Sequence, residues 1–139
     1  VELAGGVALS DAEAAENATI LLPSGAGGPA FLALPNHYVI RRYNNALSYA
    51  LAIGLLADAM DGRAGVARAW PNEPPLSRDQ AFALQRGLQA LGFDPNGIDG
   101  VIGSGTRRAL RQYQAARGLI ADGYVNEAII NRIRSEAGV

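Results

Sequence analysis

The sequence has no cysteine, a single histidine, one methionine and one tryptophan among its 139 residues. The absence of cysteine excludes disulfides and thiolate metal sites, and the lone His37 cannot form a histidine cluster. We therefore expect no metal and no cofactor. The 12 basic residues nearly balance the 13 acidic ones, so no basic footprint points to nucleic acid.

Long hydrophobic runs are missing as well. The most apolar stretch, residues 46–60, is shorter than the roughly 18 residues of a membrane span and contains Ser48, Tyr49 and Asp58. We therefore expect no membrane span in this chain. Residues 1–10 lack the basic start and apolar core of a signal peptide. Because the chain also does not begin with Met, we expect it to be a piece of a longer protein.

Two Asp-Gly pairs, Asp99-Gly100 and Asp122-Gly123, are the most informative feature that is present. Asp bonds to its own backbone and Gly accepts positive φ, so each pair predicts a tight turn. In both copies the expected helix N-cap, Gly103 or Asn126, lies four residues after the Asp. This spacing indicates a weak internal repeat in which each turn leads into a helix.

A third helix is predicted before these turns. Ser77 and Gln80 have the spacing of a capping box, and Gly92 suits the residue after the helix end. Apolar residues recur on one helical face at Ala81, Leu84, Leu88 and Leu91. Gly118 ends the second helix in the same way, so residues 76–133 predict three short helices joined by turns.

This region resembles the bacterial peptidoglycan-binding module of the three-helix type. The residues that carry the resemblance are Leu84-Gln85, Leu88, Leu91-Gly92-Phe93, Gly97, Asp99-Gly100, Gly103, Thr106, Ala109-Leu110, Tyr113-Gln114, Gly118-Leu119 and Ala121-Asp122-Gly123. The resemblance implies a small α-helical domain that binds cell-wall glycan or stem peptide and has no catalytic activity.

Four residues are candidates for a binding groove near the first turn and the second helix: Phe93, Asp99, Tyr113 and Gln114. Phe93 is a possible stacking platform. Each candidate also has a structural interpretation. Asp99 suits turn formation, which we favour, and Tyr113 continues a core face. Gln85 is equally suited to a helix-face hydrogen bond or to ligand contact.

The N-terminal half predicts a small α+β segment. Ser10 and Glu13 are spaced to cap a short helix that ends near Asn17. Residues 19–22 and 30–34 predict a hairpin over a Gly- and Pro-rich loop, and residues 37–41 are a possible further strand. Asn44 or Asn45 suits the N-cap of an apolar helix over residues 46–60.

A Gly- and Pro-rich linker is expected over residues 63–75. Its one large apolar residue, Trp70, is interpreted as packing on one domain rather than as a sugar platform.

The first half resembles the C-terminal end of the catalytic domain of the membrane-bound lytic transglycosylase B type. The matching residues are Leu22-Pro23, Gly25, Gly27-Gly28-Pro29-Ala30-Phe31-Leu32, Tyr38-Val39-Ile40, Arg42-Tyr43-Asn44-Asn45, Tyr49-Ala50-Leu51-Ala52 and Leu55-Leu56-Ala57-Asp58. In that family a peptidoglycan-binding module often follows directly. The resemblance implies cleavage between N-acetylmuramic acid and N-acetylglucosamine without water, which leaves a 1,6-anhydromuramoyl end.

One glutamate in a Glu-Ser context serves that family as acid and then base. None of the glutamates in this chain precedes a serine: they are Glu2, Glu13, Glu16, Glu73, Glu127 and Glu136. We therefore name no catalytic residue and expect the chain to be inactive alone. By resemblance, Tyr43, Asn44 and Tyr49 line the saccharide cleft. Equally, Asn44 suits a helix cap and the tyrosines suit half-buried positions.

We thus expect a mainly α protein, with a three-helix bundle preceded by a partial α+β segment of one short hairpin and one apolar helix. The expected domains are 1–62 (end of a transglycosylase-like domain), 63–75 (linker) and 76–139 (peptidoglycan-binding domain). The expected partners are glycan strands or stem peptides of peptidoglycan. The resemblance places the protein in the periplasm or cell envelope of a Gram-negative bacterium. The alternative is a non-catalytic protein-interaction module of the envelope.

The apolar helix and hairpin of residues 1–62 lack a partner surface of their own. We expect them to be completed from outside by an upstream fragment, by a second copy of the chain or by the module.

Overall fold

The computed structural model describes residues 9–139, and its contacts divide the chain into two compact units. Unit 1 contains the described residues up to Pro23 together with Gly27–Trp70, and unit 2 contains Ser24–Ala26 and Pro71–Val139. The change of unit at Pro71 falls inside the predicted linker, and the division at 62 and 75 stays a prediction. The expectations for residues 1–8, including Glu2, lie outside the described residues.

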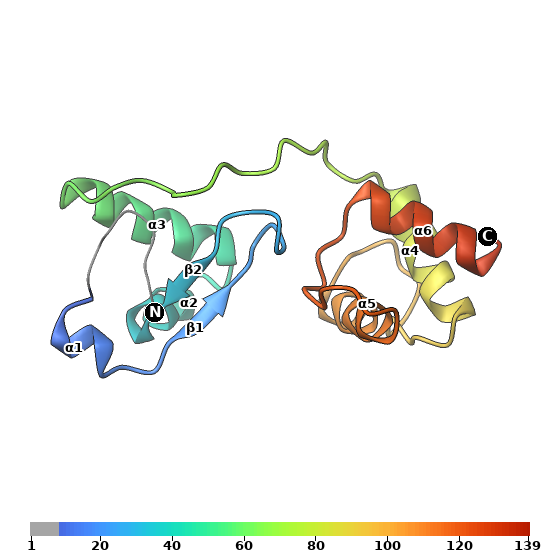
Figure 1. The fold of residues 1–139 in the computed structure, drawn as a ribbon, viewed down its shortest axis with the longest axis horizontal. Helices are drawn as coiled ribbons and strands as arrows, with labels where there is room; N and C mark the ends of the chain where they lie inside the picture. Colours follow the sequence, from blue (N-terminus) through green and yellow to red (C-terminus); the bar gives the residue numbers. More distant parts are fainter. Residues whose placement is uncertain (1–8) are drawn as a thin grey trace. The chain divides into compact units, whose positions relative to one another are not determined.

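The protein is mainly α-helical with a short hairpin, as predicted (Figure 1). Unit 1 consists of α1 (Asp11–Ala14), β1 (Thr19–Leu21), β2 (Phe31–Ala33), α2 (Pro35–Tyr43) and α3 (Leu47–Met60). Strands β1 and β2 pair antiparallel with Ile20 opposite Leu32. The predicted capping box of Ser10 and Glu13 is present at α1, which ends sooner than expected.

Two predictions for unit 1 were wrong. Residues 37–41 do not extend a strand but lie in α2, because Pro35 occupies the first helical turn, where its fixed φ favours a helix and its missing N–H costs nothing. Neither Asn44 nor Asn45 caps α3, whose N-cap is Ala46 with no side-chain bond. Asn44 instead ends α2, and its side-chain oxygen accepts a hydrogen bond from the Ala46 N–H at 3.0 Å.

Trp70, the last residue of unit 1, stacks on Phe31 of β2. The ring centroids are 5.7 Å apart and the planes differ by 26°. The linker residue therefore packs on one domain, as the sequence interpretation favoured.

Unit 2 contains three helices: α4 (Arg78–Ala90), α5 (Ser104–Ala116) and α6 (Glu127–Ala137). Their starts follow the sequence signals. Ser77 and Gln80 form the predicted capping box, and Asn126 accepts a hydrogen bond from the Ile129 N–H at 2.9 Å. Gly92 and Gly118, which follow the ends of α4 and α5, have φ of 85° and 66°. These left-handed conformations are readily adopted by glycine.

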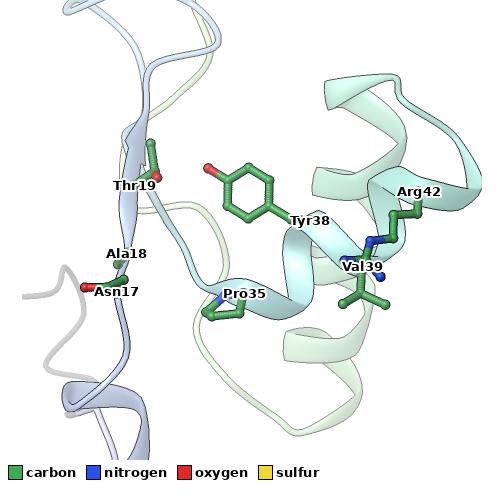
Figure 2. Close-up of a pocket in the computed structure, with 7 residues that line it drawn as sticks. All are labelled: Asn17, Ala18, Thr19, Pro35, Tyr38, Val39 and Arg42. Atoms are coloured by element: carbon green, nitrogen blue, oxygen red, sulfur yellow. The ribbon is translucent and has the colours of Figure 1, made fainter.

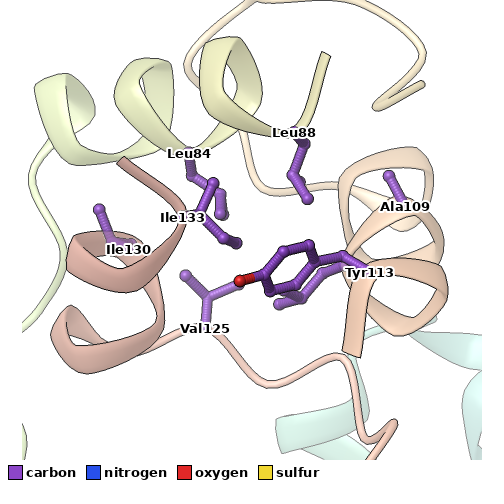
Figure 3. Packing of buried hydrophobic residues seen from close by; sticks show 8 residues of the cluster. Leu84, Leu88, Ala109, Tyr113, Val125, Ile130 and Ile133 are labelled. Carbon is purple, nitrogen blue, oxygen red and sulfur yellow. The ribbon is translucent and has the colours of Figure 1, made fainter. Parts of the chain in front are cut away.

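The core of unit 2 joins all three helices (Figure 3). Its buried residues are Leu84, Leu88, Ala109, Leu110, Tyr113, Val125, Ile130 and Ile133. Helices α4 and α6 approach closely at Gly87, where an added Cβ would lie 2.6 Å from the Ile133 Cγ2. The absence of a side chain at Gly87 therefore sets the spacing of these two helices.

None of the described helices combines the length and apolar character that a membrane span requires.

Candidate functional site

The first Asp-Gly turn is held by one buried amide, Gln85 of α4, which is only 1% exposed. Its Oε1 accepts hydrogen bonds from the Asp99 N–H (3.1 Å) and the Gly100 N–H (2.8 Å). Its Nε2 lies 2.9 Å from Asp99 Oδ1, 3.1 Å from the Val101 carbonyl oxygen and 3.1 Å from Thr106 Oγ1. Gln85 therefore links α4, the turn and the start of α5.

The second turn repeats this arrangement on α5. Gln114 donates from Nε2 to Asp122 Oδ1 at 2.9 Å and accepts from the Gly123 N–H at 2.9 Å. In both turns the Asp Oδ1 also accepts from the N–H two residues later, Val101 or Tyr124, at 2.9 Å. The repeat that the sequence indicated weakly is thus a shared geometry, in which a helix glutamine holds the turn that follows the helix.

The geometry commits Asp99 to its turn. Hydrogen bonds from Gln85 and from the Val101 N–H lower the pKa of the Asp99 carboxyl below its ordinary value of 3.8. The carboxylate is therefore ionised near neutral pH and holds the backbone of the first turn. Gln85 likewise makes a structural hydrogen-bond network, which was one of its two predicted roles.

Tyr113 is 0% exposed and completes the core (Figure 3). Its hydroxyl donates to Glu136 Oε2 at 2.8 Å. Burial is the main cause that raises the pKa of this hydroxyl above its ordinary value. Phe93, which is half-buried, meets Tyr113 edge to face with centroids 5.6 Å apart. Tyr113 is therefore a core residue that lies beneath the surface of unit 2.

A cavity of about 260 Å³ lies beside the second turn and the start of α6. Its lining residues are Gln114, Leu119, Asp122, Tyr124, Asn126, Ala128, Ile129 and Arg132. We call this cavity the module groove. Of the four residues expected to form a groove, only Gln114 lines it. Tyr124, Asn126 and Arg132 were missed, although Tyr124 could have been found because it directly follows the second Asp-Gly pair.

Unit 1 brings together Tyr43 and Tyr49, two of the three residues that were expected to line a saccharide cleft. Their ring centroids are 6.2 Å apart with planes tilted by 31°, and Tyr43 is 86% exposed. Asn44 lies beside Tyr43, and its Oδ1 is engaged in the turn before α3. The Asn45 Oδ1 accepts a 2.8 Å hydrogen bond from Arg41, which fixes this loop.

Unit 1 also contains a cavity, of about 410 Å³, which is not lined by Tyr43 or Tyr49 (Figure 2). It is lined by Asn17, Ala18, Thr19, Pro35, Tyr38, Val39 and Arg42. The Tyr38 ring extends from α2 toward β1 in the close-up. Its lining contains no carboxylate.

Glu13 does not have the ionisation that a general acid requires. A general acid needs a raised pKa. Hydrogen bonds with the N–H and hydroxyl of Ser10 instead lower the pKa of Glu13 below 4.5. Within residues 9–139 there is also no group of three or more His, Asp or Glu side chains arranged to hold a metal ion.

Comparison with known proteins identifies both units. Residues 77–133 match the family model of the putative peptidoglycan binding domain, and residues 2–58 match that of the transglycosylase SLT domain. The first half of the chain is therefore similar to transglycosylase SLT domains and the second half to peptidoglycan binding domains. A comparison with curated proteins gave no match.

The solved structures that are similar to this chain include two of SltB3 from Pseudomonas aeruginosa. One is a complex with NAG-anhNAM-pentapeptide and the other a complex with NAG-NAM-pentapeptide. Each is 48% identical, has a TM-score of 0.81 and is matched over 93% of this chain. The chain spans only 35% of the length of these relatives. The expected resemblance to a lytic murein transglycosylase of the B type is confirmed.

Proposed function

We propose that this chain binds peptidoglycan through unit 2 and thereby directs a lytic transglycosylase to the cell wall. The observation that carries the proposal is the module groove, which lies in a unit that matches the peptidoglycan-binding family. The SltB3 relatives, solved with a NAG-NAM-pentapeptide and its anhydro counterpart, support the same ligand class. The proposed reaction of the whole enzyme is cleavage of the MurNAc-GlcNAc bond to 1,6-anhydromuramoyl products in the periplasm of a Gram-negative bacterium.

The chemistry of the groove suits an amide-rich ligand. Leu119 and Ile129 supply half-buried apolar surface, and Arg132 supplies a guanidinium that binds carboxylates or carbonyls. Asn126 uses its Oδ1 to cap α6, which leaves its side-chain amide free to donate. Tyr124 adds a ring whose hydroxyl donates to Glu73 at 3.0 Å. Peptide stems and N-acetylated sugars both offer the matching carbonyl groups.

The residues that the sequence singled out take two kinds of role in this proposal. Gln114 and Tyr113 act beneath the surface, because Gln114 holds the second turn and Tyr113 fills the core. Phe93 and Asp99 are proposed to contribute at the first turn and the adjacent core edge, where Asp99 is exposed and Phe93 is half-buried. Their contact with a ligand stays a prediction.

Tyr43, Asn44 and Tyr49 are proposed to contact the glycan in unit 1. An exposed tyrosine beside a second ring offers an apolar face to a sugar, and Asn44 keeps an amide that can donate to a hydroxyl. This contact positions the glycan and supplies no acid.

Cosedimentation of the purified chain with insoluble peptidoglycan tests the proposal. We expect the wild-type chain to pellet with the polymer and Arg132→Gln to weaken binding, because it removes the cation of the groove. Arg134→Gln on the same helix is the matched control, since Arg134 does not line the groove. A wild-type chain that stays in the supernatant would overturn the proposal and favour a protein-interaction module.

A further inference from the structure

Helix α4 carries a stripe of three residues, Arg78, Phe82 and Arg86, that belongs to neither cavity. They are spaced four residues apart, so they lie along one face of the helix. The guanidinium carbons of Arg78 and Arg86 lie 5.5 Å and 5.9 Å from the centroid of the Phe82 ring. Both cations therefore converge on one half-buried aromatic ring. We call these three residues the α4 stripe.

The first Asp-Gly turn fixes the base of the stripe. A Cβ added at Gly100 would lie 2.8 Å from Phe82 Cε2 and 2.9 Å from Arg78 Cγ, so the turn packs tightly against both side chains. Arg78 also donates to the Asp99 carbonyl oxygen at 3.4 Å. Gln85 holds this turn in place. The stripe is therefore built on a rigid support rather than on a free helix surface.

The charges of the stripe are not neutralised by ion pairs. The salt bridges formed among residues 9–139 are Arg63–Asp58 and Arg117–Glu136. The Asp99 carboxylate interacts electrostatically with Arg78, but the two groups form no salt bridge. The stripe thus presents two guanidinium groups that hold no carboxylate within ion-pair distance.

The second turn offers an internal comparison. Arg78 lies seven residues before Gln85, and Arg107 lies seven residues before Gln114, so the two arginines occupy equivalent positions. Like Arg78, Arg107 donates a hydrogen bond to a carbonyl oxygen of its turn, that of Gly123 at 3.2 Å. Three residues before the glutamine the copies differ, with Phe82 in the first and Arg111 in the second. One arginine of each copy therefore serves its turn, whereas the ring and Arg86 are particular to α4 and have no such turn-holding role.

We propose that the α4 stripe binds a carboxylate of the peptidoglycan stem peptide, at a contact separate from the module groove. This inference rests on the proposed function. Guanidinium groups bind carboxylates through paired N–H donors, and an aromatic ring beneath them keeps the donors oriented. A stem peptide carries at least its terminal carboxylate and offers short apolar side chains to the ring. The stripe and the groove then hold the polymer at two points, which raises its apparent affinity.

The test is the affinity of the full chain for insoluble peptidoglycan, measured by cosedimentation, before and after the carboxylates of the polymer are converted to amides. We expect Arg78→Gln with Arg86→Gln to raise the Kd about tenfold on untreated polymer. On amidated polymer this double variant and the wild type should bind alike. The matched control, Arg108→Gln with Arg134→Gln, removes the same charge from exposed positions on α5 and α6 and should change the Kd little on either polymer.

The possible results separate this inference from the proposed function. A wild-type chain that does not bind untreated polymer overturns the proposed function itself. If the wild type binds and both double variants weaken binding equally, the effect is general charge attraction and the α4 stripe is not a site. A stripe variant that binds like the wild type, or that is still weaker on amidated polymer, also overturns the inference. Equal thermal unfolding midpoints of the proteins establish that each variant is folded.

Discussion

At the scale of single residues, two glutamines do most to define unit 2. Gln85 and Gln114 are buried amides whose donors and acceptors are both used by an Asp-Gly turn. Buried polar groups that lose their partners destabilise a fold, whereas satisfied ones specify it. These amides therefore couple the helix that carries them to the turn that supports a proposed binding surface.

Replacing Gln85 by Met tests this coupling. The variant keeps a long side chain but leaves the N–H groups of Asp99 and Gly100 without their acceptor. We expect the free energy of unfolding to fall by about 1–3 kcal/mol. Urea unfolding followed by far-UV circular dichroism measures this loss. Gln89→Met, on the exposed face of α4, is the control; equal stability of the two variants would contradict the prediction.

We predict that Glu136 makes the stability of unit 2 depend on pH in the acid range. Hydrogen bonds from Arg117 and then Tyr113 lower the pKa of this carboxyl below its ordinary value of 4.5. A lowered folded pKa contributes stability that is present above the ordinary value and is lost as the pH falls through the folded pKa. We therefore expect the thermal unfolding midpoint of the wild type to decrease when the pH is lowered below about 4.5.

Compared with the wild type, the Glu136→Gln variant should have a lower thermal midpoint at neutral pH, and its midpoint should decrease less as the pH is lowered. Thermal unfolding measured from about pH 7 to about pH 3 tests this, because that range brackets the ordinary pKa of a carboxyl group. Glu127→Gln, at the other end of α6, is the control carboxylate. Identical acid profiles for Glu136→Gln and the wild type would show that this contact does not set the acid response.

At the scale of elements, α4 was predictable because several local signals agree. The Ser77 capping box, the apolar spacing and Gly92 all pointed to the same helix. Helix α2 was missed because its short sequence after Pro35 has both helical and strand-like residues. Packing rather than periodicity decides such a segment.

Leu88 lies where α4, α5 and α6 meet, and it is fully buried (Figure 3). Leu88→Ala removes apolar contacts with neighbours that relax only partly. We expect a loss of about 2–5 kcal/mol in the free energy of unfolding, measured by chemical denaturation. A change within about 0.5 kcal/mol, the range of surface substitutions, would contradict the helix register.

The candidate site was less predictable than the elements. Tyr113 and Tyr124 are both tyrosines next to a motif, yet one fills the core and the other lines the groove. Their exposure depends on how α5 and α6 pack, and no local sequence pattern predicts this packing. The turn-forming role of Asp99 was foreseen because Asp-Gly chemistry is local. The α4 stripe was not foreseen, because its meaning depends on the Gly100 turn that packs beneath it.

At the scale of the whole molecule, we predict that the 139-residue chain has no lytic activity alone. None of its glutamates precedes a serine, which is the context expected for the acid of the family that the first half resembles. Incubation with purified peptidoglycan, followed by mass spectrometry of the soluble fraction, should detect no anhydromuropeptides. If they are released, Glu13→Gln and Glu16→Gln would identify whether either glutamate is responsible.

Unit 1 is predicted to be completed by a partner surface. Ile20 on the hairpin is 69% exposed and Met60 at the end of α3 is 80% exposed, and a two-stranded hairpin is marginal in water. We expect these residues to be covered by an upstream fragment, by a second copy of the chain or by the module. Light scattering and limited proteolysis test the prediction. A monodisperse monomer whose unit 1 resists protease without contacting the module would refute it.

The stacking of Trp70 on Phe31 gives unit 1 an optical signal of its own. Trp70 is the sole tryptophan of the chain, and it lies in unit 1. Selectively excited indole emission therefore follows unit 1 and changes when the stack on Phe31 opens, although its ring is already 46% exposed in the folded chain. The loss of helix α4 or α6 is silent in that channel, whereas far-ultraviolet dichroism records the helices of both units. Comparing the two signals thus shows whether unit 1 melts with the rest of one uncut, unlabelled chain.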